Sequence, residues 1–128
     1  AKVIPELDLK QLDYLKIDTE GNDYRVLTGF PWATLTPDVL MCEFDELKTR
    51  GLGFDYRSTG DLLTSKGYEV WISEWHPLLR YGSGHRWRSI EPYPSNVSEP
   101  DAWGNFIAVH KDSHPDTMRS LVATYGGP

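Results

Sequence analysis

The stretch that decides the fold is residues 14–29, which read YLKIDTEGNDYRVLTG. Apolar residues alternate with polar ones over residues 14–17, which is the pattern of a short strand, and the acidic turn at residues 18–21 then breaks that pattern. After the break, Asp23 is placed to cap a helix, and Gly29 is placed to end it. The stretch therefore predicts a strand, an acidic turn and a short helix, in that order.

Asp18 and Glu20 follow the end of this strand. In an open α/β sheet, ligands bind in the crevice outside the carboxyl ends of the strands, so these two acids are candidate functional residues. The alternative is that they only cap and solubilise a turn, because acids are common before helices.

A second apolar run, residues 39–44, contains Glu43 near its end. Its first four residues are all apolar, which indicates a central strand covered on both faces. The same kinds of pattern predict the remaining elements: a loop over residues 48–56, a helix that Ser58 and Thr59 cap and Gly67 ends, strands over residues 68–75 and 104–110, and a closing helix over residues 115–125.

The run from Lys16 to Gly29 resembles the K-I-D-x-E-G-x-D-x-x-V-L-x-G signature of the FkbM-type methyltransferases. The resemblance continues through residues 39–44, 67–70 and 104–109, and so covers most of the chain. It implies an S-adenosylmethionine-dependent methyltransferase fold that usually acts on a hydroxyl oxygen.

Members of this family carry, upstream of the signature, a strand that ends in a glycine-containing cofactor loop, followed by an acid that contacts the cofactor's ribose. Residues 1–13 contain no glycine, and the G-x-G triplets at residues 51–53 and 82–84 lie downstream. A lone triplet of this kind is weak evidence for a cofactor loop. The resemblance therefore implies one α/β domain, residues 1–128, that forms the C-terminal half of a Rossmann-like methyltransferase sheet without the N-terminal cofactor-binding half. This sheet is expected to be mostly parallel, with an antiparallel closing strand.

The composition is that of an ordinary globular domain, with 39% apolar and 25% charged residues in 128. Acidic residues outnumber basic ones by 19 to 13, which disfavours a phosphate-binding face, so no nucleic-acid partner is expected. No apolar stretch approaches the roughly 20 residues that span a bilayer, and the start of the chain has no signal pattern. We therefore expect no membrane partner and a cytoplasmic location. Cys42 lies in an apolar run and is expected to be a small buried side chain rather than a nucleophile.

Residues 78–100 form an insertion that is too long and too aromatic for a plain connector. It begins just after the third predicted strand, and it is expected either to cover the cleft and select the acceptor, or to pack on the domain as a static aromatic patch. Its candidate substrate-binding residues are Arg80, Tyr81, His85 and Trp87.

Methylation of a hydroxyl requires the protein to align the oxygen with the methyl group and to take up a proton. Asp18 is the first candidate to take that proton or to orient the acceptor, and His76 is the second, because the ordinary pKa of histidine lies near neutrality. Glu20, Glu43 and Glu74 are expected to help bind the acceptor. Several carboxylates at one sheet edge also suit magnesium or calcium, but no spacing here specifies a metal site and none is predicted. No residue of this chain is assigned to the cofactor.

The predicted function is S-adenosylmethionine-dependent O-methylation of a hydroxyl on a sugar or small metabolite by the full-length protein, with the 128-residue chain alone inactive. The alternative is a non-catalytic binding or dimerisation module. A domain cut through its sheet exposes a strand edge, and a second copy of the chain would cover that edge.

Overall fold

The computed structural model describes residues 8–78, 80, 82, 84–113 and 116–125. These residues form five strands and four helices, and none of the helices is long and apolar enough to cross a bilayer. In chain order the elements are β1 (Tyr14–Ile17), α2 (Asp23–Thr28), β2 (Val39–Asp45), α3 (Glu46–Thr49), α4 (Tyr56–Ser65), β3 (Tyr68–Trp75), β4 (Trp87–Pro92), β5 (Trp103–His110) and α5 (Thr117–Tyr125).

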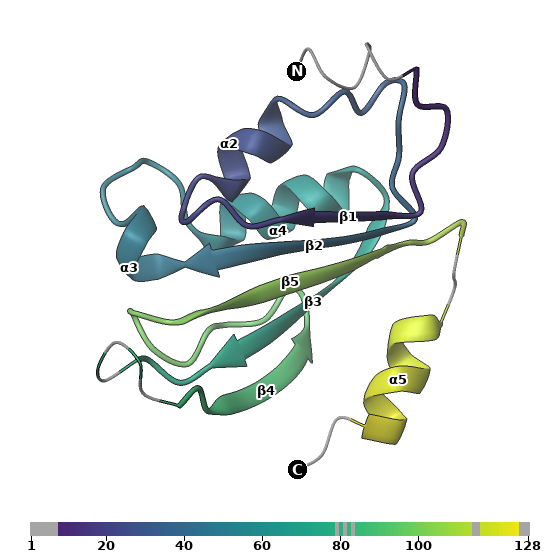
Figure 1. Ribbon diagram of the computed structural model, residues 1–128. Coiled ribbons are helices and arrows are strands. Elements are labelled where there is room, and N and C mark those ends of the chain that lie inside the picture. Colours follow the sequence, from purple (N-terminus) through teal and green to yellow (C-terminus); the bar gives the residue numbers. More distant parts are fainter. Residues whose placement is uncertain (1–7, 79, 81, 83, 114–115, 126–128) are drawn as a thin grey trace.

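The strands form one sheet in the order β1-β2-β5-β3-β4 (Figure 1). β1 pairs with β2 in parallel, whereas β5 lies antiparallel between β2 and β3, and β4 is antiparallel to β3. The expectation of a mostly parallel sheet is therefore wrong, whereas the expected antiparallel closing strand is present, because β5 runs antiparallel to both of its neighbours. After β3 the chain reverses into β4, with no helix among the described residues between them, and it then returns through the middle of the sheet as β5. β1, β2 and β3 still point the same way, which is consistent with a Rossmann-like fold.

The acidic turn after β1 depends on two residues in the left-handed region. Glu20 has φ 54° and Gly21 has φ 95°, and together they turn the chain from β1 into α2. The sequence suggests that Asp23 caps α2, but the structure shows that it does not. Asn22 occupies the N-cap position without a side-chain hydrogen bond, and Asp23 is the first residue of the helix. The side chain of Asp23 is used elsewhere, as described below.

The N-cap of helix α4 lies three residues before Ser58, the first cap that the sequence suggests. The carboxylate of Asp55 accepts the backbone N–H of Ser58 at 3.0 Å, and the Ser58 hydroxyl oxygen accepts the backbone N–H of Asp55 at 3.3 Å. This reciprocal pair is a capping box, so Asp55 rather than Ser58 or Thr59 starts the helix. The predicted loop at residues 48–56 is also shorter than expected, because its first two residues belong to α3 and its last residue belongs to α4.

Helices α2 and α4 lie on one face of the sheet and α5 lies on the other (Figure 1). The core between the sheet and α4 contains alternate residues of β2, and among them Cys42 is fully buried, which confirms the expectation for its side chain. On the second face, Met118 of α5 packs with Trp71 and Val109, and Val39 at the start of β2 adds to this smaller cluster. Figure 1 shows α5 beside the end of the sheet where β2 begins. The carboxyl ends of β1 and β2 lie at the opposite end.

Candidate functional site

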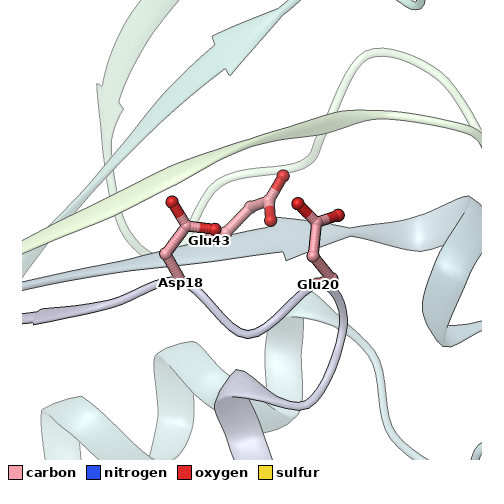
Figure 2. Close-up of side chains that lie close together, drawn as sticks. All are labelled: Asp18, Glu20 and Glu43. Carbon is pink, nitrogen blue, oxygen red and sulfur yellow. The ribbon is translucent and has the colours of Figure 1, made fainter.

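Three carboxylates meet at the carboxyl ends of β1 and β2. Asp18 and Glu20 belong to the turn after β1, and Glu43 lies on β2. Each offers an oxygen, and these oxygens all lie within 4.8 Å of one another. Figure 2 shows the three side chains on the same side of the sheet, pointing away from the helix beneath it. The structure thus brings together three of the residues that the sequence singles out.

Lys48 supplies the positive charge of this cluster. Its Nζ is bonded to the carboxylate of Glu20, and it lies 3.3 Å from Asp45 Oδ2 and 3.8 Å from Glu43 Oε1. Asp45 also caps α3, because its Oδ1 accepts the backbone N–H groups of Leu47 and Lys48 at 3.0 Å. Three clustered carboxylates have the ligand chemistry for a divalent cation. In this structure the Lys48 ammonium partly offsets the charges of Glu20 and Glu43, and Lys16 pairs with Asp18.

Sequence reasoning missed Lys48 and Asp45. The available signal was an aspartate at the end of a buried strand, with a lysine one helical turn later. An aspartate in that place caps the next helix, and an ion pair three residues apart then holds the lysine against the strand end.

The pKa values of the two best proton-acceptor candidates in the cluster, Asp18 and Glu43, are shifted in opposite directions. The Asp18 side chain is 50% exposed, and its Oδ2 accepts a hydrogen bond from Lys16 Nζ at 2.8 Å, which lowers the pKa of Asp18. The Glu43 side chain is only 15% exposed, and burial raises its pKa even though Lys48 acts in the opposite direction. A carboxylate with a raised pKa binds a proton more readily, so Glu43 is the stronger base of the two.

Asp23 fixes the position of the acidic turn against β2. Its side chain is buried, and its Oδ2 accepts the backbone N–H of Thr19 at 3.3 Å and the Thr19 hydroxyl at 2.9 Å. Its Oδ1 accepts the backbone N–H of Glu43 at 3.1 Å. A single buried carboxylate therefore holds the turn and the strand in a fixed relation.

An open cavity of about 750 Å³ lies beside the cluster. One part of its wall is charged and comes from the turn after β1, the end of β2 and α3. The rest comes from the segment after β3 and from the start of β5. The described lining residues are Glu20, Glu43, Asp45, Leu47, Lys48, Pro77, Leu78, Gly82, His85, Asp101 and Trp103.

The family model of the methyltransferase FkbM domain matches residues 1–70, which is more than half of the 128 residues. The chain belongs to the FkbM methyltransferase domain family. No curated protein and no solved structure matches the chain significantly. The FkbM match contains the acidic turn, Glu43 and Lys48, whereas the cavity residues that follow β3 lie beyond it.

Glu43 and Glu74 of this FkbM domain lie on opposite faces of the sheet. Glu43 is paired with Asn105 of β5, and Glu74 is paired with Gly104, the preceding residue of the same strand. Neighbouring residues of a strand point to opposite faces, so Glu74 faces away from the acidic cluster. It is buried, and its carboxylate accepts the backbone N–H and the hydroxyl of Ser98. Its contacts hold the insertion against β3.

His76 is likewise engaged with the insertion. Its Nδ1 lies 3.0 Å from Nη2 of Arg88, and Arg88 also donates to the carboxylate of Glu99. A guanidinium group only donates, so Nδ1 of His76 is the acceptor and is unprotonated in this contact. His76 is not among the described residues that line the cavity.

The insertion brings only part of its predicted binding residues to the cavity. His85 lines it, whereas Trp87 lies on β4 and donates from Nε1 to the hydroxyl of Ser73 at 3.2 Å. Arg80 is exposed, and it is not among the described lining residues. Tyr81 lies outside the described residues.

The later part of the insertion packs on the helical face of the FkbM domain. Tyr93 lies against the main core, and its hydroxyl donates to Asp61 of α4 at 2.5 Å. Gly60 permits this contact, because a Cβ at that position would lie 2.5 Å from the ring of Tyr93. Within the described part of the insertion, Leu78, Gly82 and His85 line the cavity, whereas Tyr93 packs against the core.

Proposed function

We propose that this FkbM domain is part of an S-adenosylmethionine-dependent methyltransferase that methylates a hydroxyl oxygen of a sugar or other small metabolite. The observation that carries the proposal is the meeting of Asp18, Glu20 and Glu43 beside an open cavity at the carboxyl ends of two parallel strands. That is where α/β sheets bind their ligands. A partly buried carboxylate at such a place is suited to take up the proton that hydroxyl methylation releases.

The charge of the cavity suits a cationic cofactor. Glu20, Glu43 and Asp45 face it with Lys48 as their shared counter-ion, so carboxylates are in excess. When bound, S-adenosylmethionine supplies a methyl group on a positively charged sulfur, which leaves as a neutral thioether. We further propose that an upstream half of a longer protein holds the adenosine part, because residues 1–13 contain no glycine with which to form a cofactor loop.

In this mechanism Glu43 accepts the proton. Glu43 lines the cavity, and its carboxylate has unused acceptor capacity, because the buried Oε2 has no hydrogen-bond partner among the described residues. Methyl transfer to the acceptor oxygen would leave the hydroxyl proton to be taken up, and Glu43 would accept it. Lys48 favours the ionised form of Glu43 against the effect of burial. Asp18, at the exposed rim, orients the acceptor.

The test compares Glu43→Gln with Asp18→Asn in the full-length protein, by transfer of a radiolabelled methyl group. Both changes keep the side-chain shape and remove the charge. We expect Glu43→Gln to lower kcat about 100-fold or more, and Asp18→Asn to lower it by less than about ten-fold. Full activity of Glu43→Gln, at an unchanged melting temperature, would refute the role of Glu43, and absence of methyl transfer by the wild-type protein would refute the function.

The 128-residue chain by itself is expected to bind S-adenosylmethionine with a Kd weaker than roughly 1 mM. Most of the polar partners of the cofactor would come from the glycine loop and the ribose-binding acid upstream. Isothermal titration calorimetry measures this affinity, and a micromolar Kd would mean that this chain holds the cofactor itself.

A second candidate function is a homodimerisation module. β1 is an edge strand of the sheet, and the Tyr14 side chain on it is 51% exposed. Pairing of β1 with β1 of a second copy would satisfy the outer backbone groups of both strands. Sedimentation equilibrium decides this proposal, because a chain that stays monomeric at the concentrations used for NMR does not form such a dimer.

A further inference from the structure

We propose that His76 is a positioning residue, whose unprotonated imidazole holds the outer wall of the cavity in place through Arg88. The outer wall consists of the described lining residues that follow β3 or begin β5, namely Pro77, Leu78, Gly82, His85 and Trp103. His76 itself is not among the described lining residues, so it acts through its neighbours. The inference rests on the proposed function in one respect, since methyl transfer is the reaction that the wall would serve.

The backbone of His76 joins the two parts of the outer wall. Its N–H donates to the carbonyl of Arg86 at 2.9 Å, so the chain that leaves β3 is bonded to the chain that enters β4. The other wall residues of this segment all lie between His76 and Arg86 in the sequence. The carbonyl of His76 accepts the indole N–H of Trp103 at 2.9 Å. A displacement of His76 therefore moves both parts of the outer wall.

The side chain of His76 anchors this junction to a mostly buried arginine. Its Nδ1 lies 3.0 Å from Nη2 of Arg88, and Arg88 also donates to the carboxylate of Glu99. The Arg88 side chain is 23% exposed, and its Nε lies 3.7 Å from Oε1 of the buried Glu74. A guanidinium group between two carboxylates is held in one orientation, so it offers the imidazole a fixed donor.

The same contact gives His76 a different role from the proton acceptor that the sequence suggests. Because a guanidinium group only donates, the lone pair of Nδ1 is already used by Arg88. A protonated ring would turn an N–H and a positive charge toward that guanidinium, so the contact requires the neutral form. In this proposal the imidazole is an acceptor that fixes geometry, and it touches none of the reacting atoms.

Hydrogen exchange of tryptophan indole N–H groups in the 128-residue chain tests the proposal by NMR. Trp103→Phe identifies the signal of Trp103. His76→Leu removes the acceptor of Arg88, and we expect it to speed exchange at Trp103 about ten-fold or more, because the carbonyl that holds this indole loses its anchor. The internal reference is Trp32, whose indole N–H donates to the carbonyl of Leu27 at 2.8 Å, and its exchange should change less than about two-fold.

A conservative variant separates the acceptor from the bulk of the ring. His76→Asn places a carbonyl oxygen near the position of Nδ1, and we expect exchange at Trp103 to return to within about two-fold of the wild type. Unchanged exchange at Trp103 in His76→Leu would overturn the proposal. Equal acceleration at Trp32 would also overturn it, because the whole fold would then be loosened. Failure of His76→Asn to restore slow exchange would refute the role of the acceptor.

Variants of the donor provide a second test. Arg88→Met should speed exchange at Trp103, and the double variant with His76→Leu should exchange no faster than the faster single variant, because both changes break one contact. The matched control is Arg86→Met, which removes an exposed guanidinium group and keeps the backbone carbonyl that His76 contacts. Additive effects of Arg88→Met and His76→Leu would show that the two side chains act separately, contrary to the proposal.

The positioning role and the proposed function fail in distinguishable ways, because indole exchange needs no cofactor, acceptor or methyl transfer. In the methyl-transfer assay of the full-length protein, His76→Leu should raise the KM for the acceptor about ten-fold and lower kcat less than about three-fold. Methyl transfer with normal exchange at Trp103 in His76→Leu would leave the enzyme and remove the positioning role. The expected exchange pattern in a protein that transfers no methyl group would leave the positioned wall and remove the enzyme.

Discussion

The carboxylate of Asp23 accepts the backbone N–H of Glu43, with 3.1 Å between Oδ1 and the nitrogen. The other oxygen of the same carboxylate holds Thr19, so one buried side chain connects the turn after β1 to the end of β2. The distance between the turn that bears Asp18 and Glu20 and the strand that bears Glu43 is set at this point. Asp23 is thus a positioning residue for the acidic cluster.

Replacing Asp23 with Ala is expected to lower the free energy of unfolding by about 3 kcal/mol, because buried donors on Thr19 and Glu43 lose their charged acceptor. Urea denaturation measures the change. The control is Asp13→Ala, an exposed aspartate, which should change stability by less than about 0.5 kcal/mol. Similar midpoints for the two variants would contradict the role given to Asp23.

The stability of the wild-type chain relative to Glu43→Gln should depend on pH in a defined direction. Burial raises the pKa of Glu43 in the folded state above its ordinary value of 4.5. Between these two pKa values the folded chain binds more protons than the unfolded chain, so wild-type stability falls as pH rises through this window. Glu43→Gln lacks this effect. Unfolding free energies of both proteins at about pH 4 and pH 7 should therefore show the variant gaining on the wild type at the higher pH. A gain in stability of the variant relative to the wild type at the lower pH would contradict the raised pKa of Glu43.

Lys48 and Lys16 should control different carboxylates. The ammonium of Lys48 lowers the pKa of Glu43, so Lys48→Met should raise that pKa further. Lys16 is the main cause of the lowered pKa of Asp18, so Lys16→Met should bring Asp18 back toward its ordinary value and leave Glu43 nearly unchanged. Side-chain carboxyl carbon shifts, followed by NMR through a pH titration, report both groups in each variant. A large response of Asp18 to the loss of Lys48 would show that the cluster titrates as one unit.

Gly104 should not tolerate even a methyl group. A Cβ at this position would lie 2.1 Å from the backbone oxygen of Ser73, so β5 and β3 would have to separate. We expect Gly104→Ala to cost about 3 kcal/mol or more of unfolding free energy, or to prevent folding. Gly84→Ala is the matched control, because a Cβ there meets no atom within 4 Å. Equal thermal stability of the two variants would be inconsistent with the close approach of β5 and β3.

Most elements of the fold were predictable because their signals are local. The alternation at residues 14–17, the apolar run at 39–44 and the glycine after α4 each act within a few residues, and the structure has elements at these places. The sheet order was not predictable in this way. Nothing local to residues 103–110 states that this segment inserts between β2 and β3, because that depends on where the earlier strands left an open edge.

The residues of the candidate site also divide into those with a local signal in the sequence and those whose place depends on distant strands. Asp18, Glu20 and Glu43 were found from the rule that strand ends carry ligands, and the structure brings them together. Glu74 also lies near the end of a strand. Neighbouring residues of a strand point to opposite faces, however, and Glu74 points to the face opposite Glu43. Trp103, which lines the cavity, was missed because its place beside the site comes from its cross-strand partner, Asp45, and not from its own neighbours in sequence.

The central position of β5 has a consequence for how the protein is made. β5 is made after the other four described strands, yet it joins β2 to β3. Until residues 103–110 emerge, β1 and β2 form one pair, β3 and β4 form another, and each pair presents an open strand edge to its surroundings. Such edges recruit other chains. A premature stop after β4 would therefore release two unjoined pairs instead of a smaller sheet.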